Sequence, residues 1–565
     1  MMKRLLFFIS ALSVLLSCAE RTPVINVVPY PNDVQFAQGQ FNVKGASVSY
    51  VGAIDEASLN VIEAFAQKLS QISTIKSPLT ESDELLEGFC FVYDGTVPEE
   101  AYTIEVAPKG VLVKASGLRG FNYAIQTLKQ MLPVEIFGTR PAPRADWTLP
   151  CVTINDAPRF AYRGLHLDEC RHFFGIDEVK RYLDIMAVHK LNKFHWHLTE
   201  DQGWRAQMLD NILLTEIGSY RSHTNFNNKP HGGYYTKEDM KEVVEYAHKK
   251  CIKVIPEIDT PGHTVSAIAA YPHLSCFDRN LSVATHCGVK HDVVCAGKES
   301  TYEFMFSVFD ELLEVFTDGL IHIGGDEVPT TRWKICPHCQ QRIKDEGLSC
   351  TEDLHPYYLS RLAEHIEAKG SKVIMWNDTV RDYMAKGSIV RQLWDEEMSE
   401  KDVVGQINKG TEFIISFVNA YYLDLPYGRT SLEKCYNYNP CYKGISKEQE
   451  SKLLGVEACL WTEFVPTMKK AGYQMFPRLG AYSETAWTSK ENKSFDYFSE
   501  KLDFYEDLVS SLGMNYATKK QSMPKGIKKL ASMLYWERRQ LCWQGLHNLI
   551  DNASVERKHK GEENK

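Results

Sequence analysis

From residue 160 onward, short apolar runs alternate with stretches whose apolar residues recur at helical spacing. This alternation predicts strands joined by amphipathic helices. One helical stretch runs through Ile176, Val179 and Leu183, and a second follows Thr236, which can cap it together with Asp239. The predicted strands are Arg163–Asp168, Lys193–Leu198, Lys253–Ile258, Leu320–Gly324, Lys372–Trp376, Ser388–Trp394, Glu412–Val418 and Gly455–Trp461.

Eight strands with intervening helices are what a (β/α)8 TIM barrel requires, and we assign residues 156–490 to it. Such a barrel places its active site at the C-terminal ends of its strands. A doubly wound open sheet is the alternative, but it would not gather eight polar strand ends around one point.

The flanking regions have other patterns. Residues 23–155 combine short alternating runs, such as Tyr102–Val106 and Gly110–Lys114, with one helical stretch from Gly117 to Leu132. They predict a small α+β domain. Residues 491–565 predict a C-terminal helical extension with helices over Phe498–Leu512 and Ile527–Ile550, packed against the barrel. Neither flank shows residues that suggest chemistry.

Composition narrows the class of protein. The chain has 565 residues, 44% hydrophobic and 24% charged, which is ordinary for a soluble globular protein of two or three domains. A formal net charge of −9 and the lack of a basic stripe with interleaved aromatic residues disfavour a nucleic-acid partner.

The N-terminus predicts export. Lys3 and Arg4 precede the apolar run Leu5–Leu16, which is too short to span a bilayer. The run ends in Leu-Leu-Ser-Cys18, which resembles a bacterial lipobox. We therefore expect residues 1–18 to be a lipoprotein signal peptide, Cys18 to be lipidated, and the protein to be anchored to the outer membrane, on its periplasmic or cell-surface side. A plain secretory signal is the alternative.

The chain contains 15 cysteines including Cys18. Cys336-Pro-His-Cys339 has the spacing of half a zinc site, and Cys350 follows, but no second CxxC accompanies it. A disulfide, a free thiol pair and a small structural metal site all remain open. Cys435 and Cys441 flank a loop that a disulfide could close.

The fourth predicted strand carries the most informative chemistry. It reads Leu-Ile-His-Ile-Gly-Gly-Asp326-Glu327, so an apolar run breaks at two glycines and ends in adjacent carboxylates. Like charges held together favour a proton on one of them. An acid that keeps its proton beside an ionised one is suited to glycosidic-bond cleavage. A loop with two solvated acids is the alternative.

Other strand ends carry residues that suit a sugar. Aromatic side chains can contact the apolar faces of a sugar, and acids and an arginine can bind its hydroxyls. The ends include Asp168 to His172, His195 to Arg205, Glu257 to His263, Trp376 to Asp378, Trp394-Asp395, Tyr421 to Asp424, and Trp461-Thr-Glu463.

On these motifs the chain resembles the β-N-acetylhexosaminidases of glycoside hydrolase family 20. The similarity runs through the whole barrel and the preceding α+β domain. The shared motifs are His-Ile-Gly-Gly-Asp-Glu at 322–327, Arg171-His172, His195-Trp-His-Leu, Asp259-Thr-Pro-Gly-His263, Val373-Ile-Met-Trp-Asn-Asp378 and Glu457-Ala-Cys-Leu-Trp-Thr-Glu463.

The resemblance implies an exo-acting, retaining enzyme that releases terminal GlcNAc or GalNAc from glycans by substrate assistance. Glu327 is the expected general acid. Asp326 would orient the 2-acetamido group, whose carbonyl oxygen attacks C1 to give an oxazolinium-type intermediate. No cofactor or catalytic metal is expected. The residues expected to bind the sugar are Arg171, Trp376, Trp394, Tyr422, Asp424, Trp461 and Glu463.

The resemblance implies that Asp259 and His263 form a supporting hydrogen-bond network behind Glu327, and that Glu200 has an orienting role. Many family members carry aspartate where this chain has Glu200, so its carboxylate should reach one bond length further. His195 and His197 are expected to be packed and hydrogen-bonded, with a metal role as the alternative. Two other functions stay open: a glycan-binding lipoprotein without catalysis, and a metal-dependent hydrolase using Asp326, Glu327, His195 and His197.

Overall fold

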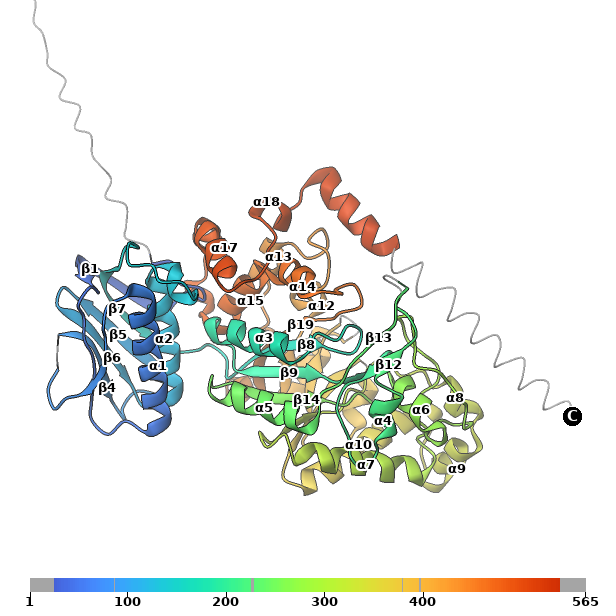
Figure 1. The fold of residues 1–565 in the computed structure, drawn as a ribbon. Coiled ribbons are helices and arrows are strands. Elements are labelled where there is room, and N and C mark those ends of the chain that lie inside the picture. The colour runs from blue at the N-terminus through green and yellow to red at the C-terminus, as the bar shows by residue number, and fades with distance from the viewer. Residues whose placement is uncertain (1–24, 86, 225–227, 379, 396–397, 539–565) are drawn as a thin grey trace, which may run out of the picture.

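The structure is a computed structural model and describes residues 25–85, 87–224, 228–378, 380–395 and 398–538 (Figure 1). Its centre is a closed barrel of parallel strands in the order β14-β15-β16-β17-β18-β19-β8-β9, which confirms the predicted (β/α)8 fold. The strands are β8 (Tyr162–Asp168), β9 (Lys193–His197), β14 (Lys253–Glu257), β15 (Leu320–His322), β16 (Lys372–Asn377), β17 (Val390–Leu393), β18 (Phe413–Ile415) and β19 (Leu453–Leu460).

The barrel strands are buried on both faces, which explains why they read as nearly continuous apolar runs. Helices surround them in a ring. The capping box predicted for α5 is present, because the Thr236 side chain accepts from the Asp239 backbone and the Asp239 side chain accepts from the Thr236 backbone. The main ring helices are α3 (Ile176–Val188), α5 (Lys237–His248), α7 (Glu299–Leu313), α10 (Leu354–Ala368), α11 (Glu400–Ile407) and α15 (Arg478–Trp487).

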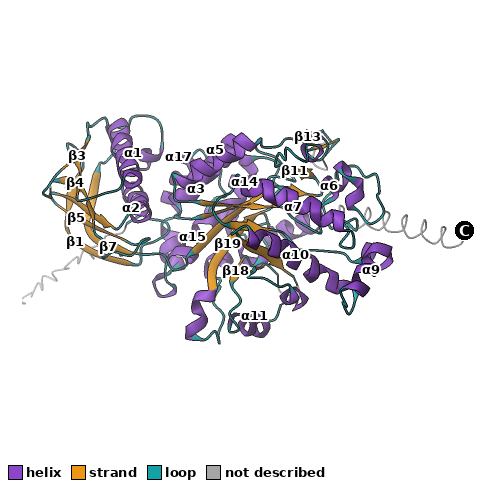
Figure 2. Ribbon diagram, turned by 90° about the horizontal axis from the view of Figure 1, so that it is seen from below, coloured by secondary structure: helices purple, strands orange, loops and turns teal. Residues whose placement is uncertain are grey.

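The first domain is a seven-stranded mixed sheet in the order β1-β7-β5-β6-β4-β2-β3. Helices α1 (Glu56–Ser73) and α2 (Leu118–Met131) pack against each other beside this sheet (Figure 2). The strands are β1 (Asp33–Asn42), β2 (Val48–Val51), β3 (Leu79–Glu81), β4 (Gly88–Tyr93), β5 (Tyr102–Ala107), β6 (Gly110–Ala115) and β7 (Thr148–Asp156). The domain has its own apolar core.

A buried polar cluster joins this domain to the barrel. Asp156, at the end of β7, accepts from the Nζ of Lys190 at 3.1 Å and from the Nε1 of Trp487 at 2.9 Å. Tyr102 of β5 donates to the same carboxylate at 2.5 Å. All four side chains are fully or almost fully buried, so the two domains share one ionic contact that water does not reach.

The C-terminal region differs in part from the prediction. The single helix expected over Phe498–Leu512 is two helices, α16 (Phe495–Glu500) and α17 (Leu502–Ser511). They meet at Lys501, whose buried ammonium bonds the Val27 carbonyl at 3.0 Å and the Glu484 carboxylate at 3.1 Å.

The second predicted helix is present over residues 526–538, and its remainder lies outside the described residues, as do the predicted signal peptide and Cys18. Within the described chain, no helix combines the length and apolar character needed to cross a bilayer.

Candidate active site

A cavity of about 230 Å³ lies at the C-terminal ends of the barrel strands. It gathers side chains from loops that are far apart in the sequence, as the barrel topology requires. Its lining includes Arg171, His263, Gly288, Asp326, Glu327, Trp394, Tyr422, Asp424, Arg429, Trp461, Glu463 and Trp536.

The backbone after β15 sets the positions of Asp326 and Glu327. Gly324 has φ +68°, and a Cβ there would lie 1.8 Å from Oδ1 of Asp259. The adjacent N–H of Gly325 donates to that same oxygen at 3.2 Å. Glu327 itself has φ +49°, a conformation uncommon for a non-glycine residue and typical of functional sites. Asp259 therefore holds the turn that presents the two carboxylates.

Asp378 fixes the backbone of Glu327 from the other side. Its Oδ2 accepts from the Glu327 N–H at 2.6 Å, and its Oδ1 accepts from Nε1 of Trp394 at 2.6 Å. Burial, with the charge of Asp326, raises the pKa of Asp378 well above its usual value. Asp378 belongs to a motif noted in the sequence, but residue type alone gave it no role.

His263 connects the catalytic pair to a second acidic group. Its Nε2 lies 3.4 Å from Glu327 Oε2 and 3.8 Å from Asp326 Oδ2, while Nδ1 lies 2.8 Å from Glu200 Oε1 and 3.4 Å from Asp201 Oδ2. Burial opposes a charge on the imidazole, but the surrounding carboxylates, Glu200 above all, raise the pKa of His263 well above its usual value. His263 is therefore a protonated, central residue of the site.

The two adjacent carboxylates have different proton affinities. Burial raises the pKa of Asp326 to about 6, with the charge of Glu327 adding to the effect and His263 opposing it. Burial also acts on Glu327, but its bond to His263 holds its pKa below the usual value. The prediction that one acid of the pair keeps its proton more easily thus applies to Asp326 in the free protein, and not to Glu327, the expected acid.

Arg171 is held rigidly at the cavity wall. Its guanidinium binds Asp168 at 3.2 Å, the Oε1 of Gln202 at 3.1 Å, and Glu200. It also lies 5.1 Å from the centre of the Trp461 ring. Glu200 therefore bridges Arg171 and His263, so its longer side chain reaches both cations from one buried position.

Two predicted acids of the cavity lining, Glu463 and Asp424, are poorly solvated. Glu463 Oε1 is 3.8 Å from Arg171 Nη2. Burial and the charge of Glu463 raise the pKa of Asp424 to about 8. The Oδ1 of Asp424 is buried without a hydrogen-bond partner among the described residues. An unsatisfied buried acceptor facing an open cavity is suited to a ligand hydroxyl.

Aromatic rings form the opposite wall. Trp394 and Tyr422 lie nearly parallel with ring centres 6.2 Å apart, and Trp461 lies 6.0 Å from Tyr422. Trp376 was expected in the same wall, but it is only 1% exposed and lies outside the cavity lining, 5.8 Å from Trp461. Its Nε1 donates to Oε1 of Glu257 at 2.6 Å.

Glu257 is the centre of a buried polar layer behind the aromatic wall. It pairs with His195 at 3.0 Å, with His322 at 3.1 Å, and with His197. His195 also binds Glu457 at 2.7 Å, and although burial opposes its charge, these two carboxylates raise its pKa to about 10. Among the described residues, no group of ligand atoms within 4.8 Å of one another combines His195 and His197 with Asp326 and Glu327, although each histidine belongs to another group that could hold a metal ion. Both histidines are buried and hydrogen-bonded to carboxylates, as predicted.

Trp536 and Arg429 are lining residues that the sequence analysis did not predict. Trp536 comes from the C-terminal helix, and the guanidinium of Arg429 lies 5.0 Å from its ring centre. The C-terminal extension, in which the sequence showed no residues that suggest chemistry, therefore contributes to the lining of the cavity. The sequence showed a tryptophan on an amphipathic helix, but not where that helix packs.

Comparison with known proteins agrees with this arrangement. Residues 160–490 match the model of the glycosyl hydrolase family 20 catalytic domain, and residues 24–157 match that of family 20 domain 2. A β-hexosaminidase of Porphyromonas gingivalis is 33% identical over 93% of this chain and 70% of its own length.

Solved structures agree as well. The family 20 β-N-acetylhexosaminidase of Streptomyces coelicolor has a TM-score of 0.77 at 28% identity, over 89% of this chain and 99% of that one. The β-N-acetylhexosaminidase of Bacteroides fragilis has a TM-score of 0.74 at 30% identity, over 88% and 99%. A mutant β-hexosaminidase of Streptomyces plicatus, bound to its product GlcNAc, has a TM-score of 0.77 at 28% identity, over 88% and 98%. The chain belongs to glycosyl hydrolase family 20.

Proposed function

We propose that the protein is an exo-acting β-N-acetylhexosaminidase that removes terminal β-linked N-acetylhexosamine with retention of configuration. The observation that carries this proposal is the His263–Glu327 contact placed beside Asp326 in a small cavity with one aromatic and one charged wall. The family membership supports the same activity, because its relatives are β-hexosaminidases.

In the first step, Glu327 donates a proton to the glycosidic oxygen while the substrate's own acetamido oxygen attacks C1. The C1–O bond breaks, and the new C1–O bond closes an oxazolinium ring. Asp326 accepts the amide N–H and stabilises the positive charge that develops on it. Since the nucleophile belongs to the substrate, its attack is intramolecular and gains from proximity. Glu327 then removes a proton from water, which opens the ring at C1.

Glu327 must be protonated at the start, yet in the free protein His263 lowers its pKa. Its side chain is 41% exposed to water. A sugar in the cavity removes this water, and burial favours the neutral carboxyl. The proton that His263 carries at Nε2, 3.4 Å away, then passes to Glu327. His263 and Glu327 thus act together as the proton donor.

The charged wall recognises the sugar. Arg171 donates to ring hydroxyls, and Asp424 and Glu463 accept from them, since each acid is poorly solvated in the free site. Trp394, Tyr422 and Trp461 pack on the ring and on the acetamido methyl. Trp536 adds a further ring to the lining of this cavity, whose volume of about 230 Å³ suits a single terminal sugar and so favours exo action.

A panel of β-linked aryl glycosides tests this function. We expect hydrolysis of 2-acetamido glucosides and galactosides, and at least a thousandfold lower kcat/KM for matched glycosides with a hydroxyl at C2, which lack the nucleophile. Equal rates for the two groups would contradict substrate assistance. Tight binding of a GlcNAc-thiazoline without turnover of any glycoside would instead indicate a binding protein.

We further propose that the protein is exported and anchored by a lipid on Cys18. The support is sequence alone: two cations, a short apolar run and a lipobox-like ending. Labelled palmitate should enter the wild-type chain and not Cys18→Ala, which should be released into the soluble fraction. A soluble wild-type chain without label would contradict the anchor.

A further inference from the structure

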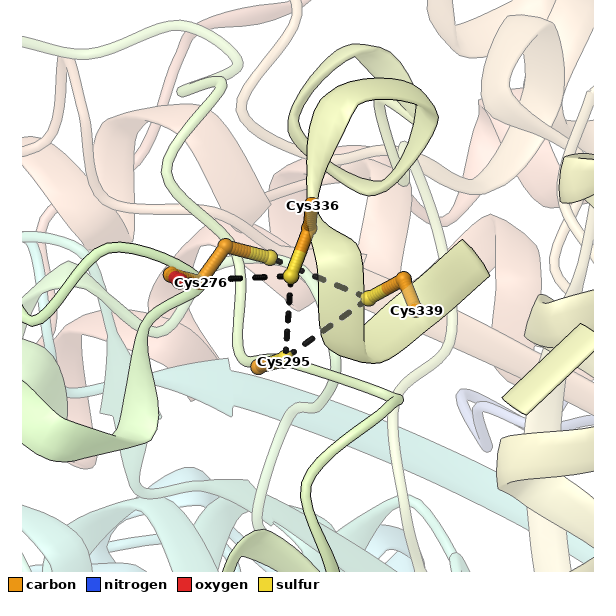
Figure 3. Close-up of side chains that lie close together, drawn as sticks. All are labelled: Cys276, Cys295, Cys336 and Cys339. Carbon is orange, nitrogen blue, oxygen red and sulfur yellow. Dashed lines mark hydrogen bonds between the residues drawn. The ribbon is translucent and has the colours of Figure 1, made fainter. Parts of the chain in front are cut away.

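Four buried cysteines meet at one point outside the catalytic cavity (Figure 3). Cys276 and Cys295 come from the long loop that follows β14, and Cys336 and Cys339 come from the turn that begins helix α9 (Pro337–Asp345). All four side chains point toward a common centre. The thiols therefore meet where two adjacent strand-to-helix loops of the barrel pack together, beside hydrogen bonds such as that from Nε1 of Trp333 to the Val294 carbonyl at 3.0 Å.

The distances between the sulfur atoms distinguish the possible arrangements. Cys295 Sγ lies 3.7 Å from Cys336 Sγ and 3.6 Å from Cys339 Sγ, and Cys276 Sγ lies 3.9 Å from Cys339 Sγ. A disulfide would bring one pair of sulfurs to about 2.05 Å. Sulfurs at the corners of a tetrahedron about zinc, each about 2.3 Å from the metal, lie about 3.8 Å apart.

We propose that these four cysteines bind one structural zinc ion. Cys295 and Cys339 each have two sulfur neighbours at nearly the same distance, which one central ion explains and a set of pairwise bonds does not. The four-thiolate tetrahedron is a closed coordination shell for zinc, so the ion has a structural and not a catalytic role. No other assigned feature of the protein uses these thiols.

The surrounding backbone fits a fixed metal-binding turn. Cys336 is the N-cap of α9 and Pro337 is its first residue, so the helix N-terminus faces the thiols and favours thiolates. At Gly297, just beyond Cys295, an added Cβ would lie 2.2 Å from the backbone of His338. Only glycine allows the two loops to approach this closely beside the cluster.

The cluster also anchors a loop that reaches the active site. Cys276 and Cys295 stand at the two ends of a stretch without helix or strand, and Ser275 pairs with Val294 across its base. Farther along, Gly288 lines the catalytic cavity, and the carbonyl of His286 accepts from Gln202 at 2.8 Å. Gln202 in turn accepts from Arg171. Zinc thus holds in place a loop that supports the sugar-binding arginine.

The first experiment measures metal in the wild-type protein, purified without added metal or chelator. Elemental analysis should find about one zinc per chain. Thiol titration in denaturant should find these four cysteines reduced, and mass spectrometry should find no disulfide among them. Adding Co²⁺ to protein stripped of zinc should give the absorption of tetrahedral cobalt thiolate.

Variants then locate the metal. Cys276→Ser, Cys295→Ser, Cys336→Ser and Cys339→Ser should each lose zinc and unfold at a temperature several degrees lower, since binding free energy of a structural metal is folding free energy. Cys350→Ser is the matched control, because Cys350 follows the CxxC pair closely in the sequence but lies outside the cluster. It should keep one zinc per chain. Variants that fold should show a raised KM with a smaller change in kcat.

Any of four outcomes would overturn the proposal: wild-type protein without bound metal, disulfides between these cysteines in the wild type, stoichiometric iron in place of zinc, or zinc that remains in all four single variants. The wild-type measurements need no variant to fold and decide the question by themselves.

Discussion

The imidazole of His263 lies directly against the carboxylate of Glu327, with Nε2 3.4 Å from Oε2. Burial opposes a charge on His263, but the carboxylates around it, Glu200 above all and Glu327 among them, raise its pKa, while the contact with His263 lowers the pKa of Glu327. In the proposed mechanism, the proton needed to cleave the glycosidic bond is thus held on His263, beside the residue that delivers it.

Replacing His263 should change how activity depends on alkaline pH. In the wild type, His263 keeps the proton well above its usual pKa, so kcat/KM should persist into alkaline solution. In His263→Asn the proton must reside on Glu327 alone. The basic limb of kcat/KM should therefore move to lower pH, and kcat should fall. A variant with lower kcat but an unmoved basic limb would show that His263 only positions Glu327.

The acidic limb of the kcat/KM profile should depend on the protonation of Asp326. Its pKa of about 6 means that the carboxylate becomes protonated below that pH. A neutral acid stabilises the oxazolinium poorly, so kcat/KM should fall about tenfold for each pH unit below 6. Because the pKa of Asp326 is higher in the folded protein than in the unfolded chain, the folded state gains stability as pH falls from about 6 toward the pKa of an unfolded aspartate. Circular dichroism should show intact fold where activity is already lost, and coincident loss of both would contradict this assignment.

Substrates with different leaving groups should distinguish the role of Glu327 from that of Asp326. Glu327→Gln should slow hydrolysis of a disaccharide by roughly 10²- to 10⁴-fold, because its leaving group needs a proton. A dinitrophenyl glycoside, whose leaving group departs as an anion, should be affected far less. Asp326→Asn should slow both substrates alike. Glu303→Gln, an exposed position on α7, is the control. Equal effects of Glu327→Gln on the two substrates would exclude it as the acid.

The bridging role of Glu200 predicts sensitivity to a single methylene. Glu200→Asp cannot reach both Arg171 and His263, so one charged hydrogen bond is lost. Such a bond contributes about 1.5 kcal/mol or more, so kcat/KM should fall about tenfold or more. Glu200→Gln keeps the length of the side chain and loses its charge, so the basic limb of kcat/KM, which depends on His263, should move to lower pH. Wild-type kinetics in Glu200→Asp would contradict the bridge.

Trp536 should affect binding more than chemistry. Trp536→Ala removes a ring from the cavity lining without touching the carboxylates. KM should rise several-fold while kcat changes little. Leu534→Ala, at an exposed position of the same helix, should leave both constants unchanged. An unaltered KM in Trp536→Ala would show that the helix takes no part in the site.

The barrel could be predicted because buried parallel strands leave a continuous apolar signature and their ends carry the chemistry. Asp326 and Glu327 follow directly from that pattern, as does their closeness to Arg171 and Trp461. The role of Asp378 could not be predicted, because it acts on a backbone N–H and not on a side chain with a recognisable partner.

Other parts of the site depend on how distant segments pack. Trp536 reaches the cavity only because the C-terminal helix docks beside Gly428, where a Cβ would lie 2.6 Å from the Lys529 carbonyl. Cys276 and Cys295 lack CxxC spacing, so only the fold reveals their relation to Cys336. Trp376 ends a barrel strand as Trp394 and Trp461 do, but it is only 1% exposed and lies behind the aromatic wall.

The shared contact between Asp156 and Lys190 also bears on how freely this enzyme could be shortened. A barrel excised from the chain after residue 156 would lose both oxygen partners of the Lys190 ammonium, Asp156 and Tyr102, and would expose to water a face that is buried in the intact protein. The catalytic barrel is therefore not an independent folding unit. The N-terminal domain stabilises it through this contact, although that domain contributes no atom to the chemistry.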